Sequence, residues 1–233
     1  MKLGIFTDSH YSSAELTCGK RYNSKSLVKI REAMAYFVKN NVDVIICLGD
    51  LIDHEISHEA ETENLKKISE VFKEYKTPIY AVVGNHDGFA FEREEFYSVL
   101  GEEYRPPESL ETQGKMLIFT DTCYFKSGEH YKPGDTDWTD TFLPDTTRLE
   151  RILSEGTGDA YLFMHHNIDP EIQQDHRVFN DAEIREILEK SGRVKTVFQG
   201  HFHGGHTSVH GGINYVTFPA MCENDKAYFI IKI

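Results

Sequence analysis

The chain has 233 residues, which is enough for one large domain or two small ones with a substantial buried core. Hydrophobic residues make up 39% of it and charged residues 27%, as in ordinary globular proteins. Its formal net charge is −13, which repels nucleic-acid polymers and anionic membrane surfaces, so we expect neither as a partner. No stretch approaches the roughly 18 apolar residues that a membrane helix needs.

The N-terminal residues favour a first strand over a secretory signal, because the apolar run of residues 2–6 turns polar at Thr7 and Asp8. The four cysteines are widely spaced and form no CxxC pair. A chain of this length does not need a disulfide framework to fold. We therefore expect a cytoplasmic protein.

Predicted strands and helices alternate in the first half of the chain. The strands are the short apolar runs 2–6, 42–48 and 79–83, and the second of them is rich in β-branched residues. Between them, residues 26–40 and about 65–75 carry apolar side chains at helical spacing. This order predicts a parallel sheet with right-handed crossovers.

The second half begins with a loop-rich segment, about 118–144, which contains the only tryptophan. A short helix around 149–153, a strand at 161–164, a helix that ends at Gly192 and a strand at 194–199 follow. The remaining residues alternate short strands with turns. We therefore expect more antiparallel strands in this half than in the first.

Residues of metal-ligand type follow every strand of the α/β part. They are Asp8 and His10, then Asp50 and Asp53, then Asn85, His86 and Asp87, then His165 and His166, and finally His201 and His203. The carboxyl ends of parallel strands meet at one edge of a sheet, so five loops would place these side chains together. A single such residue is weak evidence, whereas five motifs in this position together predict a metal site.

Carboxylate oxygens and imidazole nitrogens together suit borderline divalent ions such as Mn, Fe or Zn. One carboxylate can bridge two ions, and Asp50 is the best candidate for that position. Two ions about 3.5–4 Å apart clamp the attacking and leaving oxygens of an in-line phosphoryl displacement, and a hydroxide between them is a nucleophile near neutral pH. We therefore expect two divalent ions and hydrolysis of a small phosphorylated substrate, since bound ions reverse the acidic field locally.

The motifs as an ordered set resemble the calcineurin-like metallophosphoesterase family. They are DSH at 8–10, GDLID at 49–53, GNHD at 84–87, HH at 165–166 and GHFH at 200–203. The resemblance implies an α/β fold, a four-layer α/β/β/α sandwich with two facing mixed β-sheets. It also implies a single domain over residues 1–233, in which a loop-rich segment of about 105–160 shapes the substrate pocket.

The resemblance also assigns residues to the two ions. One ion would take Asp8, His10, His203 and the bridging Asp50, and the other would take Asp50, Asn85, His201 and one of the paired histidines. The family histidine is typically followed at the second position by proline, whereas Asn167 stands there after His165. We favour His165 because it directly follows the strand, with His166 as the alternative.

Two further residues acquire roles from the same resemblance. His86 corresponds to the histidine that contacts the substrate phosphate and can protonate the leaving group, and Asp53 corresponds to the acid that orients it. Every ligand position is filled and His86 is present, which disfavours an inactive scaffold. A nuclease is disfavoured by the acidic balance and by the lack of a Lys/Arg cluster beside the motifs.

A narrower resemblance points to the branch with manganese-dependent ADP-ribose/CDP-alcohol diphosphatases. It rests on RYNSKSL at 21–27, on Phe91, Arg93, Glu94 and Glu95 after GNHD, and on GINYVTF at 212–218. It implies hydrolysis of a nucleoside-diphosphate-linked small molecule. The alternative is a phosphodiesterase or phosphomonoesterase acting on another small substrate, such as a cyclic nucleotide or a glycerophosphodiester.

Several residues near the motifs remain open between a structural and a substrate-binding role. Each separate arginine is a surface charge by default and a candidate for phosphate binding: Arg21, Arg93 and Arg105. Each aromatic residue near the loops is a core or anchoring residue by default, and one of them can stack on a nucleobase: Tyr11, Phe89, Phe91, Trp138 and Phe202. The sequence gives no expectation for the oligomeric state.

Overall fold

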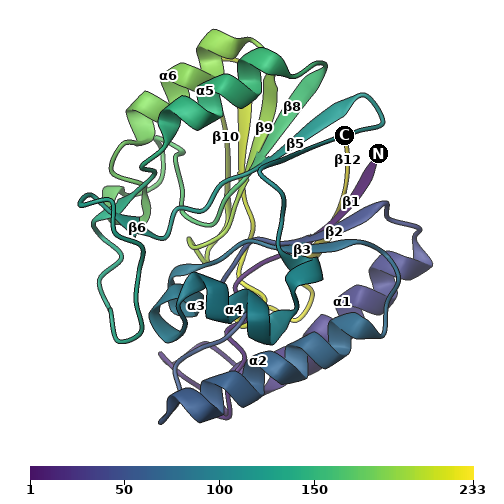
Figure 1. Cartoon of the computed structure of the whole chain (residues 1–233). Helices are drawn as coiled ribbons and strands as arrows, with labels where there is room; N and C mark the ends of the chain where they lie inside the picture. The colour runs from purple at the N-terminus through teal and green to yellow at the C-terminus, as the bar shows by residue number, and fades with distance from the viewer.

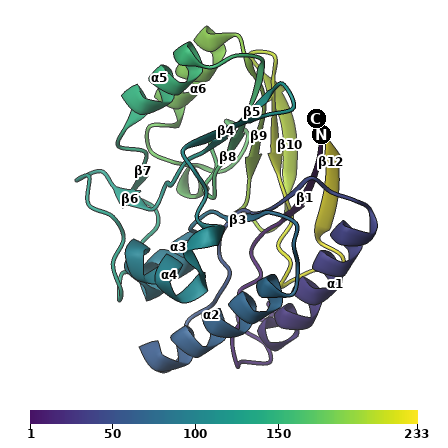
Figure 2. The same cartoon turned by 45° about the vertical axis from the view of Figure 1, so that its right-hand side comes forward.

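A computed structural model describes all 233 residues. Two β-sheets face each other and helices cover their outer sides, α1 and α2 on one side and α5 and α6 on the other (Figure 1). The turned view shows the same layers and places the two termini side by side (Figure 2), where the Met1 ammonium donates to the Ile233 carbonyl oxygen at 3.0 Å. The predicted four-layer α/β/β/α sandwich is confirmed.

The first sheet has the strand order β12-β1-β2-β3. Its strands are β1 (Lys2–Phe6), β2 (Val44–Cys47), β3 (Ile79–Ala81) and β12 (Tyr228–Lys232). As expected, β1, β2 and β3 are parallel, while β12 is antiparallel to β1. The crossover helices are α1 (Ser26–Lys39) and α2 (His58–Lys73). After β3 come two short helices, α3 (Asn85–Ala90) and α4 (Arg93–Leu100).

The second sheet has the order β10-β11-β9-β8-β5-β4. Its four central strands are parallel: β5 (Lys115–Phe119), β8 (Asp159–Phe163), β9 (Val194–Gln199) and β11 (Ile213–Thr217). The edge strands β4 (Ser109–Thr112) and β10 (His206–His210) are antiparallel to their neighbours. The helices of this half are α5 (Thr146–Glu155) and α6 (Asp181–Ser191). Within the two large sheets, antiparallel pairing is therefore confined to the edge strands.

The remaining elements are three short 3₁₀ turns and one small hairpin. The turns are Asn23–Lys25, Glu102–Tyr104 and Gln174–His176, and the hairpin pairs β6 (Tyr124–Phe125) with β7 (Thr141–Phe142). The segment 118–144 is loop-rich, as the sequence predicts. None of the helices is both long enough and apolar enough to span a membrane.

The alternation of side chains along the strands divides the core into layers. On β2, Val44 and Ile46 face the second sheet, whereas Ile45 and Cys47 pack with residues of α1 and α2. The second sheet contributes stacked aromatic rings to the layer between the sheets: Phe163 has ring centroids 5.2 Å from those of both Phe119 and Phe198. Helices α5 and α6 cover the opposite face of that sheet. This packing fixes the two sheets relative to each other, so that the carboxyl ends of their parallel strands lie near one another.

The sequence pattern did not predict α3 and α4. Helix α3 has six residues, too few for a recognisable helical period, and it begins at Asn85 within the GNHD motif. Gly84 precedes it because any larger residue is excluded there. A Cβ atom at Gly84 would lie 2.2 Å from Asp50 Oδ1 and 2.3 Å from the Asp50 backbone nitrogen. The motif therefore turns the chain directly from β3 into a helix against the Asp50 loop.

Substitution of Phe163 tests how much the layer between the sheets contributes to the stability of the fold. Its side chain is fully buried between two stacked rings, so Phe163→Ala should lower the free energy of unfolding by about 3–5 kcal/mol. Urea unfolding followed by circular dichroism measures this change. The control Val209→Ala, at a residue that is 62% exposed on the edge strand β10, should change it by less than about 0.5 kcal/mol. Equal effects of the two substitutions would contradict the assigned core.

Candidate metal centre

The loops after β1, β2, β3, β8 and β9 meet at the carboxyl ends of both sheets. Backbone hydrogen bonds tie the first two loops together: Asp8 N–H donates to the Gly49 carbonyl at 3.0 Å and His10 N–H to the Asp50 carbonyl at 2.9 Å. Asp8, His10, Asp50 and His201 have positive φ angles, between 44° and 65°. Non-glycine residues seldom adopt this backbone conformation, and it concentrates at functional sites, where the surrounding structure holds it.

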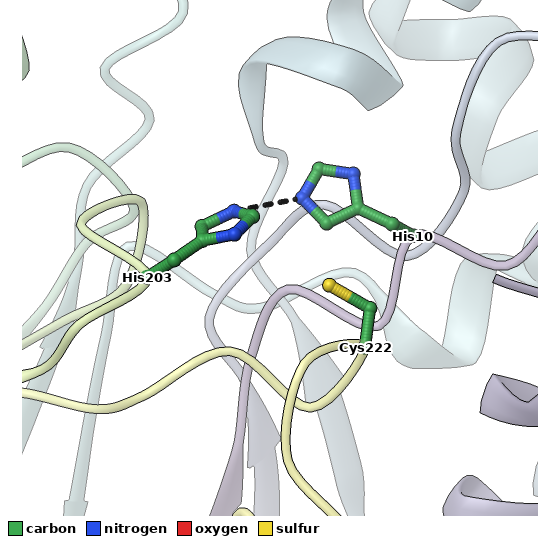
Figure 3. Close-up of side chains that lie close together, drawn as sticks. All are labelled: His10, His203 and Cys222. Carbon is green, nitrogen blue, oxygen red and sulfur yellow. Dashed lines mark hydrogen bonds between the residues drawn. The ribbon is translucent and has the colours of Figure 1, made fainter. Parts of the chain in front are cut away.

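The first group of converging side chains consists of Asp8, His10, Asp50 and His203. His10 Nε2 lies 3.1 Å from His203 Nε2, 3.4 Å from Asp50 Oδ2 and 3.8 Å from Asp8 Oδ1. His203 Nε2 is 3.4 Å from Asp8 Oδ1. Figure 3 shows the His10 and His203 rings facing each other from different loops. Four donor atoms therefore surround one point.

The second group consists of Asp50, Asn85, His165 and His201. His165 Nε2 lies 3.4 Å from Asp50 Oδ2 and 3.1 Å from Asn85 Oδ1. The His201 ring centroid is 5.1 Å from that of His165. Asp50 Oδ2 is thus 3.4 Å from one imidazole nitrogen of each group, the place where a bridging oxygen belongs.

The spacing and chemistry of these donors fit divalent ions. Metal–nitrogen and metal–oxygen bonds of about 2.1 Å put neighbouring ligand atoms about 3.0–3.4 Å apart, which covers most of the separations observed. Asp8 Oδ1 and His201 Nε2 are buried and have no hydrogen-bond partner within the protein. Buried polar atoms are rarely left unpaired, so these two indicate a missing partner. The seven predicted ligand side chains are brought together and could hold two ions that share Asp50.

His165 and His166 differ in what their rings contact. His165 Nδ1 lies 2.7 Å from the Leu48 carbonyl oxygen, to which it donates, and this directs Nε2 toward Asp50 and Asn85. His166 Nδ1 is bonded instead to the Thr122 hydroxyl at 2.8 Å. His166 Nε2 is buried and unpaired near the His201 ring. The distances to the shared carboxylate favour His165.

The charge states follow from burial and from the opposite charges in the site. Burial opposes ionisation of Asp8 and Asp50, but neighbouring histidines outweigh it and hold both pKa values well below the usual range. Burial lowers the pKa of His10 to about 4 and that of His201 well below its ordinary value. The pKa of His165 is raised to about 9, because the Asp50 charge outweighs burial. Without ions, the anionic carboxylates are therefore only partly balanced by protons on the imidazoles.

His86 and Asp53 lie beside the predicted ligands. His86 N–H donates to Asp50 Oδ1 at 2.8 Å, and the ring atom Nδ1 lies 2.9 Å from Asp53 Oδ1. Burial opposes ionisation of Asp53, yet the contact with His86 keeps the Asp53 pKa below its usual range. Arg21 Nη1 is 3.5 Å from His86 Nε2 and 3.6 Å from Asp53 Oδ2. Of the three candidate arginines, Arg21 is the one beside the ligands.

Asp87, the last residue of the GNHD motif, fastens the ligand loops to one another. Its carboxylate accepts backbone N–H groups from Gly84 at 3.0 Å and from Leu51 at 2.9 Å. Burial and the nearby charge of Asp50 raise the pKa of Asp87 to about 7. Asp87 therefore holds the loop after β2 against the start of α3 without pointing at the ligand groups.

Sequence reasoning missed three residues that contact the predicted ones. Glu223 accepts from His203 Nδ1, and Asn23 Nδ2 donates both to the His10 carbonyl at 2.7 Å and to Asp53 Oδ2 at 2.8 Å. The His176 ring lies 5.2 Å from that of His201. Asn23 belongs to the RYNSKSL segment that was already singled out, whereas Glu223 and His176 stand in turns with no motif. Only the folded chain brings these two to the site.

Cys222 lies beneath His10 and His203, as Figure 3 shows. Its backbone N–H donates to the Asp8 carbonyl at 3.0 Å, and burial raises the pKa of its thiol. Its Sγ and one ring nitrogen each of His10 and His203 lie within 4.8 Å of one another. Cys222 therefore packs against the first group.

A cavity of about 330 Å³ opens onto both ligand groups. Lys20 and Arg21 lie on its wall, and so do three aromatic side chains, Trp138, His176 and Phe202. The other candidate arginines pair elsewhere, Arg93 with Asp121 and Arg105 with Glu94. The aromatic candidates Phe89 and Phe91 belong to the hydrophobic core, and Tyr11 packs against it. The arrangement can take a phosphate at the ligand groups and a flat ring beside them.

Comparison with known proteins places these features in a family. Residues 1–205 match the family model described as calcineurin-like phosphoesterase. A probable cyclic nucleotide phosphodiesterase from Fibrobacter succinogenes is 25% identical over 229 residues, covering 87% of this chain and 73% of the relative. The 3',5'-cyclic adenosine monophosphate phosphodiesterase CpdA from Haemophilus influenzae is 25% identical over 204 residues, covering 82% of this chain and 66% of the relative.

Solved structures show the same fold. A dimetal phosphatase from Danio rerio superposes with a TM-score of 0.84 over 98% of this chain and 91% of its own, at 16% sequence identity. The two curated relatives are described as cyclic nucleotide phosphodiesterases and not as ADP-ribose or CDP-alcohol diphosphatases, so the narrower resemblance is not supported by them. The matched motifs, the two-sheet sandwich and the converging carboxylates and imidazoles agree with the family model, and the chain belongs to the calcineurin-like phosphoesterases, a family of metal-dependent phosphoester hydrolases.

Proposed function

We propose that this chain is a phosphodiesterase that hydrolyses a small nucleotide, with a 3',5'-cyclic nucleotide as the favoured substrate class. The observation that carries the proposal is one cavity in which aromatic side chains lie beside the two ligand groups that share Asp50. The descriptions of the two curated relatives support the same class. The chain spans 73% and 66% of the lengths of those relatives, so their substrates are transferred here only as a proposal.

Asp8, His10, Asp50 and His203 would hold one ion, and Asp50, Asn85, His165 and His201 the other. When bound, a pair of Mn, Fe or Zn ions would lower the pKa of an attacking water and neutralise charge on the phosphate. Glu223 would orient His203, and the Leu48 carbonyl would orient His165, each by accepting a hydrogen bond from the other ring nitrogen. Which of these metals binds would depend on the geometry of the site and on the supply of each metal in the cell.

The groups of the protein itself would bind the phosphate and move a proton. With Nδ1 held at Asp53, the His86 ring presents Nε2 toward Arg21 and the cavity. An Nε2 proton can pass to the oxygen that leaves phosphorus, and Asp53 stabilises the charged ring before transfer. The Arg21 guanidinium, a fixed fork of donors, can bind a non-bridging phosphate oxygen.

The aromatic wall supports a nucleotide over a simple alkyl phosphate. Trp138, His176 and Phe202 line the cavity beside the ligand groups, and the Trp138 ring centroid lies 6.1 Å from that of His201. A nucleobase can stack on such side chains with a gain of about 1–3 kcal/mol. In this arrangement the base would lie next to the second ligand group, and the phosphate would lie between the predicted ligands and Arg21.

A nucleoside-diphosphate-linked molecule is the second candidate, on one observation. Lys20 stands next to Arg21 on the cavity wall and pairs with Glu223 at 3.2 Å, so two neighbouring cations border the ligand groups. A cyclic nucleotide carries one phosphate, whereas a nucleoside diphosphate carries two and would use both cations. The two candidates therefore differ in how much they need Lys20.

A substrate panel with manganese-loaded protein tests the proposal. It should contain 3',5'-cyclic AMP and GMP, ADP-ribose, CDP-choline, glycerophosphocholine and bis-nitrophenyl phosphate, and kcat/KM should be highest for a cyclic nucleotide. The matched control is Asp50→Asn, which keeps the size of the side chain but removes a charge that both ions would share. It should retain the fold by circular dichroism and lose activity by at least about 100-fold, since metal affinity falls. Preference for ADP-ribose would select the second candidate, and an Asp50→Asn variant with near-normal turnover would refute the assigned centre.

His86→Ala should separate phosphate binding from proton transfer. General acid help matters most for poor leaving groups such as alkoxides and little for nitrophenolate. We expect turnover of an alkyl phosphodiester to fall by roughly 10²–10⁴ and that of a nitrophenyl ester to fall clearly less, with the metal content unchanged. Asp53→Asn should give a weaker form of the same pattern, because the ring stays but loses its partner. Equal losses on both esters would show that His86 only binds phosphate, and loss of metal would show that it is a ligand.

A further inference from the structure

A second cavity, here called the α4–α5 cavity, shares no lining residue with the cavity that opens onto the metal centre. Its volume is about 180 Å³, and it lies where helix α4, the end of β5 and the start of α5 come together. Two arginines line it, Arg93 from α4 and Arg148 from α5. We propose that the α4–α5 cavity binds a small organic anion, whose carboxylate or phosphate head lies between these two arginines. The inference does not depend on the proposed substrate.

The unpaired polar atoms of this cavity can all donate hydrogen bonds. The Nε–H groups of Arg93 and Arg148 and the hydroxyl group of Thr120 are buried, and none of them has a hydrogen-bond partner in the protein. Asp121 Oδ2 lies 3.2 Å from Arg93 Nε but does not accept a hydrogen bond from it. Thr120 is only 2% exposed, so bulk water does not reach its hydroxyl group. Buried polar atoms are rarely left unpaired, and three donors around one cavity indicate an acceptor that the chain does not supply.

The carboxylates on the wall of the cavity, in contrast, already have donors. Asp121 Oδ1 accepts the Cys123 N–H at 2.9 Å. Asp145 Oδ1 accepts the backbone N–H of Arg148 at 2.9 Å, and Glu108 Oε1 accepts from the Arg148 guanidinium at 3.1 Å. The cavity therefore lacks acceptors and not donors. A carboxylate or phosphate oxygen is the acceptor that a guanidinium binds most strongly.

A charged histidine offsets the buried carboxylate of Asp121. His130 Nε2 lies 3.1 Å from Asp121 Oδ2, and His130 Nδ1 lies 2.9 Å from the Tyr131 carbonyl oxygen. Both ring nitrogens thus face acceptors, which a ring with two protons satisfies. Burial opposes this charge, yet the hydrogen bond to Asp121 outweighs burial and raises the pKa of His130. Because His130 offsets Asp121, the charge of Arg93 remains available to a ligand.

The rest of the wall fits a compact apolar body behind the anionic head. Its apolar side chains are Tyr97, Pro106, Phe119, Tyr124 and Leu143. The Tyr97 hydroxyl donates to the Ala81 carbonyl at 2.9 Å, which holds that ring in place. The volume of about 180 Å³, against about 330 Å³ at the metal centre, suits a ligand smaller than a nucleotide. An anion with one aromatic ring matches both the size and the chemistry of the wall.

The position of the cavity makes its occupant a ligand and not a substrate. None of the predicted metal ligands lines it, so an anion bound there would lie away from the reacting groups. The two sites are nevertheless close along the chain. Thr120 precedes Thr122 by two residues, and the Thr122 hydroxyl is bonded to His166 Nδ1 at 2.8 Å, beside the ligand loop after β8.

Calorimetric titration of manganese-loaded protein with benzoate and with phenylphosphonate tests the proposal. Each probe has an anionic head on one aromatic ring, and neither contains an ester bond. We expect at least one of them to bind, and the double variant Arg93→Gln/Arg148→Gln to weaken that binding by about 10-fold or more, because charge-assisted hydrogen bonds are lost. The tighter probe identifies the head as a carboxylate or a phosphate. The matched control Arg31→Gln removes an arginine that pairs with Glu74 at the outer helices and should leave binding unchanged.

Asp50→Asn separates this site from the paired centre. The same probe should bind this variant as tightly as wild type, whereas loss of binding would place the anion at the metals and overturn the proposal. The double variant should stay folded by circular dichroism and keep nitrophenyl esterase activity. If it misfolds, Arg148→Gln alone gives the comparison at a side chain that is 25% exposed. A folded variant that binds as tightly as wild type, or a wild-type protein that binds neither probe, would also overturn the proposal.

Discussion

The carboxylate of Asp50 is almost fully buried between two imidazoles, and each of their nearest nitrogens lies 3.4 Å from the same oxygen. Its other oxygen accepts the His86 N–H at 2.8 Å. A charge in this position has to be balanced, since a lone carboxylate out of water is very costly. Neighbouring residues make room for this carboxylate and hold its loop in place. Gly84 has no Cβ because one would collide with Asp50, and Asp87 holds the adjoining loops by accepting their N–H groups.

The two-sheet architecture supplies the donors from both sides of this carboxylate. The first sheet brings Asp8, His10 and Asn85 on loops that follow parallel strands, and the second brings the histidines after β8 and β9. Because the aromatic layer between the sheets fixes their relative position, donor atoms from separate loops reach separations of 3.1–3.8 Å. Bringing these donor atoms together requires positive φ angles in the ligand loops, and the packed core holds the backbone in this strained conformation.

The fold and the convergence of the predicted ligand side chains could be predicted because both depend on local patterns. Each parallel strand is a short apolar run, and each ligand motif follows one directly, as with Asp50 after β2 and His201 after β9. Helices α3 and α4 are too short for a periodic signal, and α3 overlaps the GNHD motif. Contacts across the chain were not predictable: Glu223 reaches His203 from 20 residues away, and Trp138 and His176 enter the cavity from loops without a motif. The choice among substrates was harder still, because it depends on that cavity wall and the motifs do not encode it.

We propose that Asp50 is shared by two ions. A crystal grown with manganese, with diffraction measured on both sides of the manganese absorption edge, tests it most directly. We expect two anomalous peaks about 3.5–4 Å apart, with one Asp50 oxygen between them. Asp8, His10 and His203 should surround one peak, and Asn85, His165 and His201 the other. A single peak in fully loaded protein, or two peaks of which only one contacts Asp50, would contradict it.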